Sequence, residues 1–114
     1  PPIYHYQSRT ENVDEILLEG LPLGSFKGET YSQVDIVSEP GDAFVFISDG
    51  LPEATNKSEK MLGYRAVLDC VKENGKNSAE EIKQSLFDLG TAWLDGIKNQ
   101  DDITVVVVKK EKIS

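Results

Sequence analysis

Apolar and polar positions along the chain predict short strands first, then two helices and a closing strand. Residues 2–7 and 13–19 are β-prone runs, and the polar residues 8–12 between them are typical of a hairpin loop. The Pro- and Gly-containing segment 21–29 predicts a loop, and residues 31–39 then alternate as a half-buried strand does.

Residues 41–50, GDAFVFISDG, place a turn, an apolar run and a carboxylate in succession. Pro40 and Gly41 suit the central positions of a type II turn, because Pro fixes φ and Gly supplies a positive φ. The strand that follows is therefore expected to run antiparallel to the one before it. The continuous apolar run 43–47 predicts a strand covered on both faces, at the centre of the sheet. Asp49 follows after Ser48, and a carboxylate at the edge of a core is costly to desolvate unless it is hydrogen-bonded, paired or cation-bound.

Helical spacing governs the second half of the chain. Apolar residues at positions 64, 67, 68 and 71 predict an amphipathic helix that ends at Asn74-Gly75. Ser78 and Glu81 form a capping box before a second helix, whose apolar face ends near Gly96. The β-branched run 103–108 predicts a buried strand. Strands first and helices later predict an α+β fold with antiparallel strands.

The totals are those of one ordinary globular domain. The chain has 114 residues, and a chain of this length buries roughly two-thirds of its unfolded surface. Twenty acidic and twelve basic residues give a net charge of -8, which repels nucleic acid and anionic lipid. Residues 1–12 lack a secretory signal, and no segment is long and apolar enough to span a membrane. One cysteine, Cys70, excludes an internal disulfide and favours a reducing, cytoplasmic compartment.

Acidic residues stand at the ends of two predicted buried strands. Asp49 follows the run 43–47, and Asp101 and Asp102 precede the run 103–108. If these strands are antiparallel neighbours, three carboxylates meet at one edge, where their charges repel unless a cation neutralises them. Hard divalent cations prefer such oxygen ligands. The residues alone leave a second interpretation open, because Asp-Gly is also a common turn dipeptide and Asp-Asp also occurs as a solvated strand boundary.

Several motifs in order resemble one enzyme family. GDAFVFISDGLPEATN at 41–56 resembles the "GD, apolar strand, (S/T)DG, (V/L)xEA" segment of metal-dependent PPM-type protein phosphatases, in the bacterial SpoIIE-like or RsbU-like branch. Residues 61–90 are similar to that branch's Gly-opened helix and Ser-capped second helix, and QDDITVVVVK at 100–109 to its closing DDiT strand. LPLG at 21–24 resembles its g-x-PLG element, and PPIYHY at 1–6 the strand after a Gly-His-Pro turn. The resemblance covers nearly the whole chain and implies half of an α/β/β/α sandwich.

The resemblance also implies a metal centre. By it, Asp49 and Asp101 are metal ligands and catalytic residues, and Asp102 orients a ligand or helps to hold a third, weaker metal. Two Mn²⁺ or Mg²⁺ ions in the complete domain activate water for attack on phosphoserine or phosphothreonine. Thr104 is expected to be a structural hydroxyl. No protein nucleophile is needed, and we expect His5 to serve packing.

The chain departs from the family pattern in its length. The family domain is roughly twice as long, and its first half carries a metal-bridging aspartate in an Asp-x-x-Gly-His-Gly type motif that this sequence lacks. We therefore expect residues 1–114 to be the C-terminal portion of a SpoIIE-like PPM phosphatase domain, inactive alone. The missing half is expected to leave an apolar sheet face uncovered and to favour self-association.

Three functions remain to be compared. The resemblance implies a phosphatase that acts on a phosphorylated anti-sigma-factor antagonist of the STAS type in bacterial signalling. The alternative is a non-catalytic interaction module, or pseudophosphatase, that retains the fold without the full metal centre. A receiver-like phosphoacceptor ranks below both, because that fold alternates strands with helices. The polar loop 52–60 follows Asp49 and is a candidate flap over the site.

Overall fold

The N-terminal runs form the predicted hairpin. In the computed structural model, which describes residues 1–17 and 36–111, strand β1 (Ile3–Gln7) pairs antiparallel with β2 (Asn12–Ile16). The turn closes with a hydrogen bond of 2.8 Å from the main-chain N–H of Glu11 to the carbonyl of Gln7. Glu11 adopts a positive φ of 57°, as a tight reversal between strands often requires.

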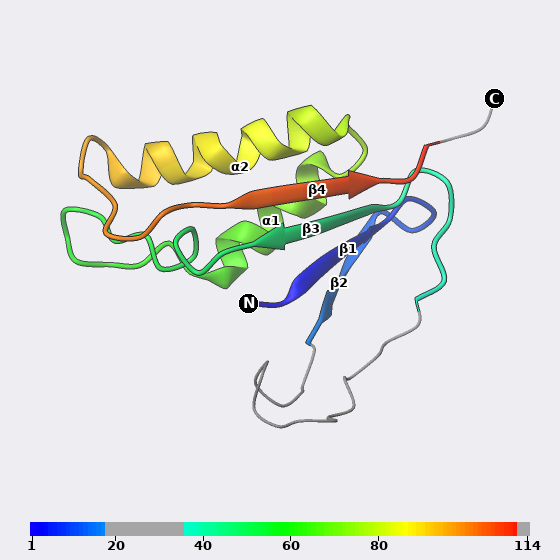
Figure 1. Cartoon of the computed structure of the whole chain (residues 1–114), viewed down its shortest axis with the longest axis horizontal. Coiled ribbons are helices and arrows are strands. Elements are labelled where there is room, and N and C mark those ends of the chain that lie inside the picture. The colour runs from blue at the N-terminus through cyan, green and yellow to red at the C-terminus, as the bar shows by residue number, and fades with distance from the viewer. Residues whose placement is uncertain (18–35, 112–114) are drawn as a thin grey trace, which may run out of the picture.

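The central strand is β3 (Ala43–Ile47), and it enters the sheet through the predicted turn. Gly41 has a φ of 92°, and the N–H of Asp42 donates to the carbonyl of Glu39, as expected of a type II turn. Strand β3 pairs antiparallel with β1 on one side and with β4 (Val105–Lys109) on the other. The sheet order is β2-β1-β3-β4 (Figure 1).

The strand predicted at 31–39 is not found in the described part of that range. Residues 36–39 form no strand, while residues 31–35 and the predicted loop 21–29 lie outside the described residues. The strand after the turn was expected to run antiparallel to this segment, but residues 36–39 provide no strand beside it. Both edges of β3 already carry the hydrogen bonds of β1 and β4.

Two helices follow β3, as the periodicity predicts. Helix α1 (Tyr64–Asn74) ends at Gly75, and α2 (Ala79–Leu94) begins at the Ser78–Glu81 capping box, with both of its hydrogen bonds formed. No helix among the described residues is long and apolar enough to cross a membrane. Figure 1 shows both helices on one face of the sheet.

The core lies between the helices and this covered face. Tyr4 and Tyr6 of β1, the inward residues of β3, and one apolar stripe of each helix form a single buried cluster. The members of the cluster are Tyr4, Tyr6, Ala43, Val45, Ile47, Leu51, Val67, Val71, Ile82, Leu86 and Val105. Burial of this apolar surface is the main force that holds the helices on the sheet.

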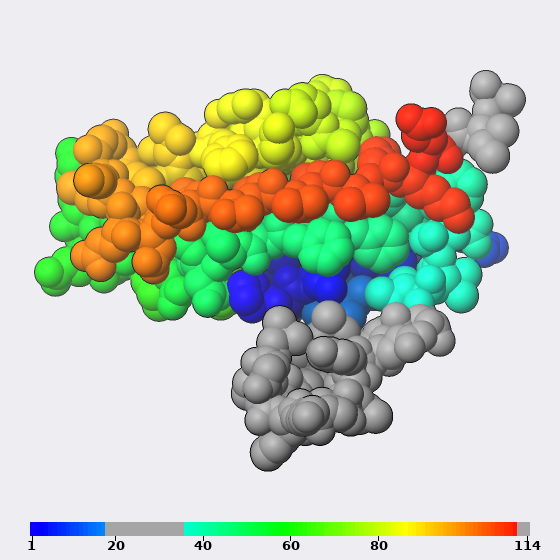
Figure 2. Space-filling model, viewed as in Figure 1, coloured from blue at the N-terminus to red at the C-terminus, as the bar shows by residue number. Residues whose placement is uncertain are grey.

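Within residues 1–17 and 36–111, no element covers the opposite face of β3 and β4, which corrects the expectation that β3 is buried on both sides. Phe46 is 41% exposed, and its neighbours on β4, Val106 and Val108, are 50% and 53% exposed. In Figure 2 these two strands lie side by side on the visible face with no helix over them. An apolar run therefore indicates a strand, but it does not say how many faces this chain covers.

Candidate metal centre

The ends of β3 and β4 meet, as the sequence predicted. Ile47 pairs with Val105, and the N–H of Ser48 then donates to the carbonyl of Thr104 at 3.0 Å. Regular pairing stops there, because the N–H of Thr104 donates to the Ser48 hydroxyl at 2.9 Å instead of to a main-chain carbonyl. The strand consequently begins at Val105, two residues later than predicted.

Ser48 and Gly50 bring the two acidic ends into main-chain contact. The Ser48 hydroxyl donates to the carbonyl of Asp102 at 3.1 Å. A Cβ atom on Gly50 would lie 2.2 Å from that same carbonyl oxygen, so this position has no room for a side chain. In the Ser-Asp-Gly tripeptide, Ser48 hydrogen-bonds to the opposite segment, Asp49 supplies a carboxylate, and Gly50 allows the two backbone segments to approach closely.

Asn99 also links the segment after β3 to the segment before β4 through hydrogen bonds. Its side-chain amide donates to the carbonyl of Gly50 at 2.9 Å and to the carbonyl of Asp101 at 2.7 Å. Both amide hydrogens are used, so one side chain fixes the backbone on either side of the gap between Asp49 and Asp101. Nothing in the sequence pattern singles out this residue.

Asp49 avoids a large desolvation cost by remaining accessible. Its side chain is 57% exposed, although it follows a buried strand by only two positions. The hydroxyl of Tyr64, the first residue of α1, donates to Asp49 Oδ1 at 3.1 Å. Tyr64 was not identified from the sequence, where it reads as part of the apolar face of the helix.

Asp101 and Asp102 also have exposed side chains. The three carboxylates were expected to converge; among residues 1–17 and 36–111, no group of three or more His, Cys, Asp or Glu side chains could hold a metal ion. The backbone of the two strand ends converges, while the side chains do not form a complete site. The acidic donors are all carboxylate oxygens, which suits Mg²⁺ or Mn²⁺. Asp49 and Asp101 would supply ligand oxygens of the kind that such an ion prefers.

A polar cleft of about 420 Å³ adjoins this edge. Its lining joins the segment after Asp49 to the segment before Asp102 and includes Glu53, Glu59, Lys98 and Asp101. The segment 52–60, proposed above as a flap, is anchored at both ends.

The anchors of this segment are apolar residues and one indole. Leu51 and Ala54 are fully buried, Thr55 forms a β-bridge with Met61, and the indole N–H of Trp93 donates to the carbonyl of Lys60. These contacts hold the segment against α2 and the core.

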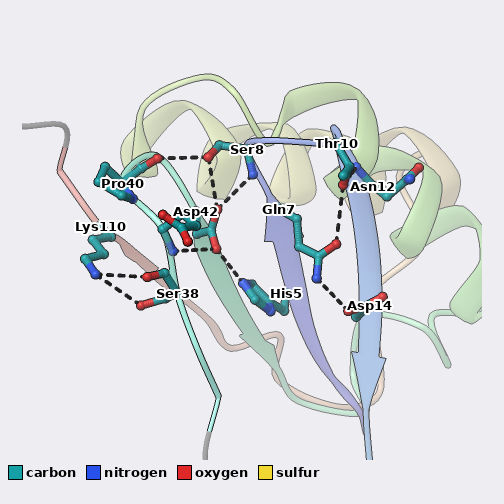
Figure 3. A network of polar contacts seen from close by, with 11 residues as sticks. His5, Gln7, Ser8, Thr10, Asn12, Asp14, Ser38, Pro40, Asp42 and Lys110 are labelled. Carbon is teal, nitrogen blue, oxygen red and sulfur yellow. Dashed lines mark hydrogen bonds and ion pairs between the residues drawn. The ribbon is translucent and has the colours of Figure 1, made fainter.

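A second polar network lies at the other end of β3 (Figure 3). Asp42 is buried and accepts hydrogen bonds from the His5 ring, from the N–H of Glu39, and from both the N–H and the hydroxyl of Ser8. Burial raises the pKa of Asp42, but these hydrogen bonds outweigh it and lower the pKa to about 2. His5 also stacks on Phe44, with ring centroids 4.4 Å apart. His5 thus packs, as expected, and the importance of Asp42 was missed.

Comparisons with known proteins agree on one family. The model of the family "Stage II sporulation protein E (SpoIIE)" matches residues 1–111. No curated protein sequence is a match.

Three solved structures share the fold. The SiaA-PP2C domain of Pseudomonas aeruginosa has a TM-score of 0.72 at 21% identity over 96% of this chain and 44% of that one. The phosphatase domain of SpoIIE from Bacillus subtilis, from a crystal presoaked with Mn, has a TM-score of 0.70 at 19% identity over 100% and 48%. The RsbU and RsbW domains of a Mycobacterium tuberculosis protein give 0.69 at 23% identity over 97% and 30%. This chain spans less than half the length of each.

Proposed function

Because the chain belongs to the SpoIIE family of PP2C-type phosphatases, we propose that it is the C-terminal portion of a metal-dependent protein serine/threonine phosphatase domain. One observation carries the proposal. The antiparallel pairing of β3 and β4 places Ser48-Asp49-Gly50 against Asp101-Asp102. In a member of this family, that edge is where two metal-binding aspartates are expected.

Each residue at this edge has a proposed role. Asp49 and Asp101 would bind the metal, and Asp102 would orient a ligand or support a further ion. Ser48 and Asn99 hold the two backbones at a fixed separation through their hydrogen bonds. When bound, a pair of Mn²⁺ or Mg²⁺ ions supplies a nucleophilic water and neutralises charge on the phosphoryl group.

The described residues provide only part of this centre, since no group of three suitable side chains occurs among them. A cation with two carboxylates and no bridging partner is bound weakly, and its water is not held for attack. We therefore propose that the 114-residue chain alone does not turn over a phosphoprotein.

The proposed substrate is a phosphorylated regulatory protein of the STAS anti-sigma-factor antagonist type, in the bacterial cytoplasm. The net charge of -8 argues against nucleic acid as a partner. The single cysteine fits a reducing compartment.

The experiment begins with the coding sequence upstream of Pro1. We expect it to encode an Asp-x-x-Gly-His-Gly type motif, and the protein encoded by the whole reading frame is then assayed on a phosphoserine protein with Mn²⁺. Asp49→Asn and Asp101→Asn are expected to abolish turnover. Asp95→Asn is the matched control, because Asp95 is an exposed α2 cap in the left-handed conformation that Asn also favours.

A non-catalytic module is the second candidate, favoured by the absence of a complete metal-binding group among residues 1–17 and 36–111. An upstream reading frame without the aspartate motif, together with no Mn²⁺-dependent turnover, would establish it. Robust turnover by the 114-residue chain, abolished by Asp49→Ala, would instead overturn the proposal that this portion is inactive alone.

A further inference from the structure

Tyr64 makes an unusual contact for a residue of an amphipathic helix. It is the first residue of α1, it follows Gly63 with a φ of 89°, and its side chain is partly exposed. Tyr64 lies at the N-terminal end of the face that carries Val67 and Val71, and its hydroxyl donates to Asp49 Oδ1 at 3.1 Å. Within the part of the chain that the structure describes, no other side chain donates a hydrogen bond to Asp49.

The donor is carried by a rigid element, whereas its acceptor is not. Val67 and Val71 anchor α1 in the core with no exposed surface, so the start of the helix has a fixed position relative to β1 and β2. Asp49 lies beyond the end of β3 and is largely exposed, and an exposed carboxylate without a partner samples several rotamers. The Tyr64 hydroxyl selects one of them.

The contact also makes the two carboxylate oxygens of Asp49 different from each other. Oδ1 accepts from Tyr64, which leaves Oδ2 as the oxygen with its lone pairs available for a cation. Groups that orient a metal-binding carboxylate in this way typically change metal affinity by about 10- to 100-fold when they are removed.

We propose that Tyr64 is a positioning residue that orients the Asp49 carboxylate for divalent-cation binding. This inference rests on the proposed function, because it requires Asp49 to bind a metal. It adds a residue from α1 to a centre otherwise built from the ends of β3 and β4. The phenol acts through Asp49 and not on the metal itself.

The test is a Mn²⁺ titration of the 114-residue chain, followed by paramagnetic broadening of the amide signals of Gly50 and Asp102. Tyr64→Phe removes only the hydroxyl and is expected to raise the Mn²⁺ concentration at half-broadening by about 10-fold. Tyr6→Phe is the matched control, because it removes a tyrosine hydroxyl from β1 and is expected to leave the titration unchanged. Thermal unfolding of each variant verifies that the fold is retained.

A double-mutant cycle separates positioning from a general structural effect. In the Asp49→Asn background, Tyr64→Phe is expected to have no further effect on the weakened binding, because the residue it positions is already altered. Equal effects in both backgrounds would overturn the inference, and so would a Tyr64→Phe titration identical to that of the unmodified chain. The latter result would leave the metal site itself standing. Absence of saturable broadening at Gly50 and Asp102 in the unmodified chain would reject the metal site, and the role of Tyr64 with it.

Discussion

Nε2 of His5 lies 2.8 Å from Oδ2 of Asp42, and the two side chains are 3% and 2% exposed. A carboxylate can only accept hydrogen bonds, so Nε2 carries the proton in this pair. The contact joins β1 to the turn that precedes β3, at the end of the sheet opposite Asp49. It therefore helps to fix how β3 is aligned within the sheet.

Replacing Asp42 by Asn is expected to destabilise the fold by about 3 kcal/mol, the magnitude typical of a broken buried pair. The NH2 group of the new amide cannot accept a hydrogen bond, so at least one of the donors that now contact Asp42 would lose its acceptor. Chemical denaturation of the variant measures the loss. Asp14→Asn is the control, since Asp14 is exposed and accepts one hydrogen bond, from Gln7; it should change the stability by less than about 0.5 kcal/mol. Equal effects at the two positions would refute the role given to Asp42.

The same carboxylate predicts a dependence of stability on acid. The pKa of Asp42 is lowered from 3.8 to about 2 in the folded protein. The contribution of its ionised form is therefore complete above the unfolded pKa near 4 and is lost as the pH falls toward 2. Unfolding curves recorded between pH 5 and pH 2 should show this loss in the unmodified chain and a smaller loss in Asp42→Asn. Parallel curves for both proteins would contradict the assignment.

Gly50→Ala is expected to disturb the meeting of the two strand ends, because the new Cβ would overlap the carbonyl oxygen of Asp102. The amide resonances of Ser48 and Thr104 should shift in the variant. Gly96→Ala is the comparison, since Gly96 has space around it but a φ of 89°; it should cost about 1 kcal/mol and leave those resonances in place. Unchanged resonances in Gly50→Ala would show that the contact is not close in solution.

Cys70 is expected to react slowly with alkylating reagents. Burial raises the pKa of its thiol, and nearby Glu73 adds to the effect. The reactive thiolate is therefore scarcer at pH 8 than in a free cysteine. The rate of thiol modification should rise several-fold when the chain is unfolded in urea. Equal rates in the folded and the unfolded chain would rule out this environment.

The uncovered face of β3 and β4 is expected to drive self-association of the 114-residue chain. Phe46→Lys should shift sedimentation toward the monomer, because it places a charge in the middle of the exposed apolar face. Met61→Lys is the matched control, since Met61 is also apolar and exposed but lies outside the sheet. A monomer at all concentrations would contradict this prediction.

Elements that depend on neighbouring residues could be predicted from the sequence. The β1–β2 hairpin, the type II turn at Pro40-Gly41, the Ser78 capping box and both helices follow from spacing and turn chemistry within a few positions. The acidic residues at two strand ends, Asp49 and Asp101, were also found in this way. The antiparallel pairing of β3 with β4, which brings the two strand ends to one edge, was inferred correctly.

Apart from that strand pairing, the contacts between distant segments could not be predicted. His5 and Asp42 are 37 positions apart, Gly50 and Asn99 are 49 apart, and Asp49 and Tyr64 belong to different elements. The strand order β2-β1-β3-β4 likewise depends on which two strands pair with the edges of β3. No local pattern encodes such choices.

By itself, the sequence determined the kinds of elements and the family to which their motifs belong. Only the tertiary structure decided which face of the sheet is covered and which polar groups meet. The physical reason is that helical and β periodicity arise from short-range geometry, whereas a hydrogen bond between remote residues forms only after the chain has packed.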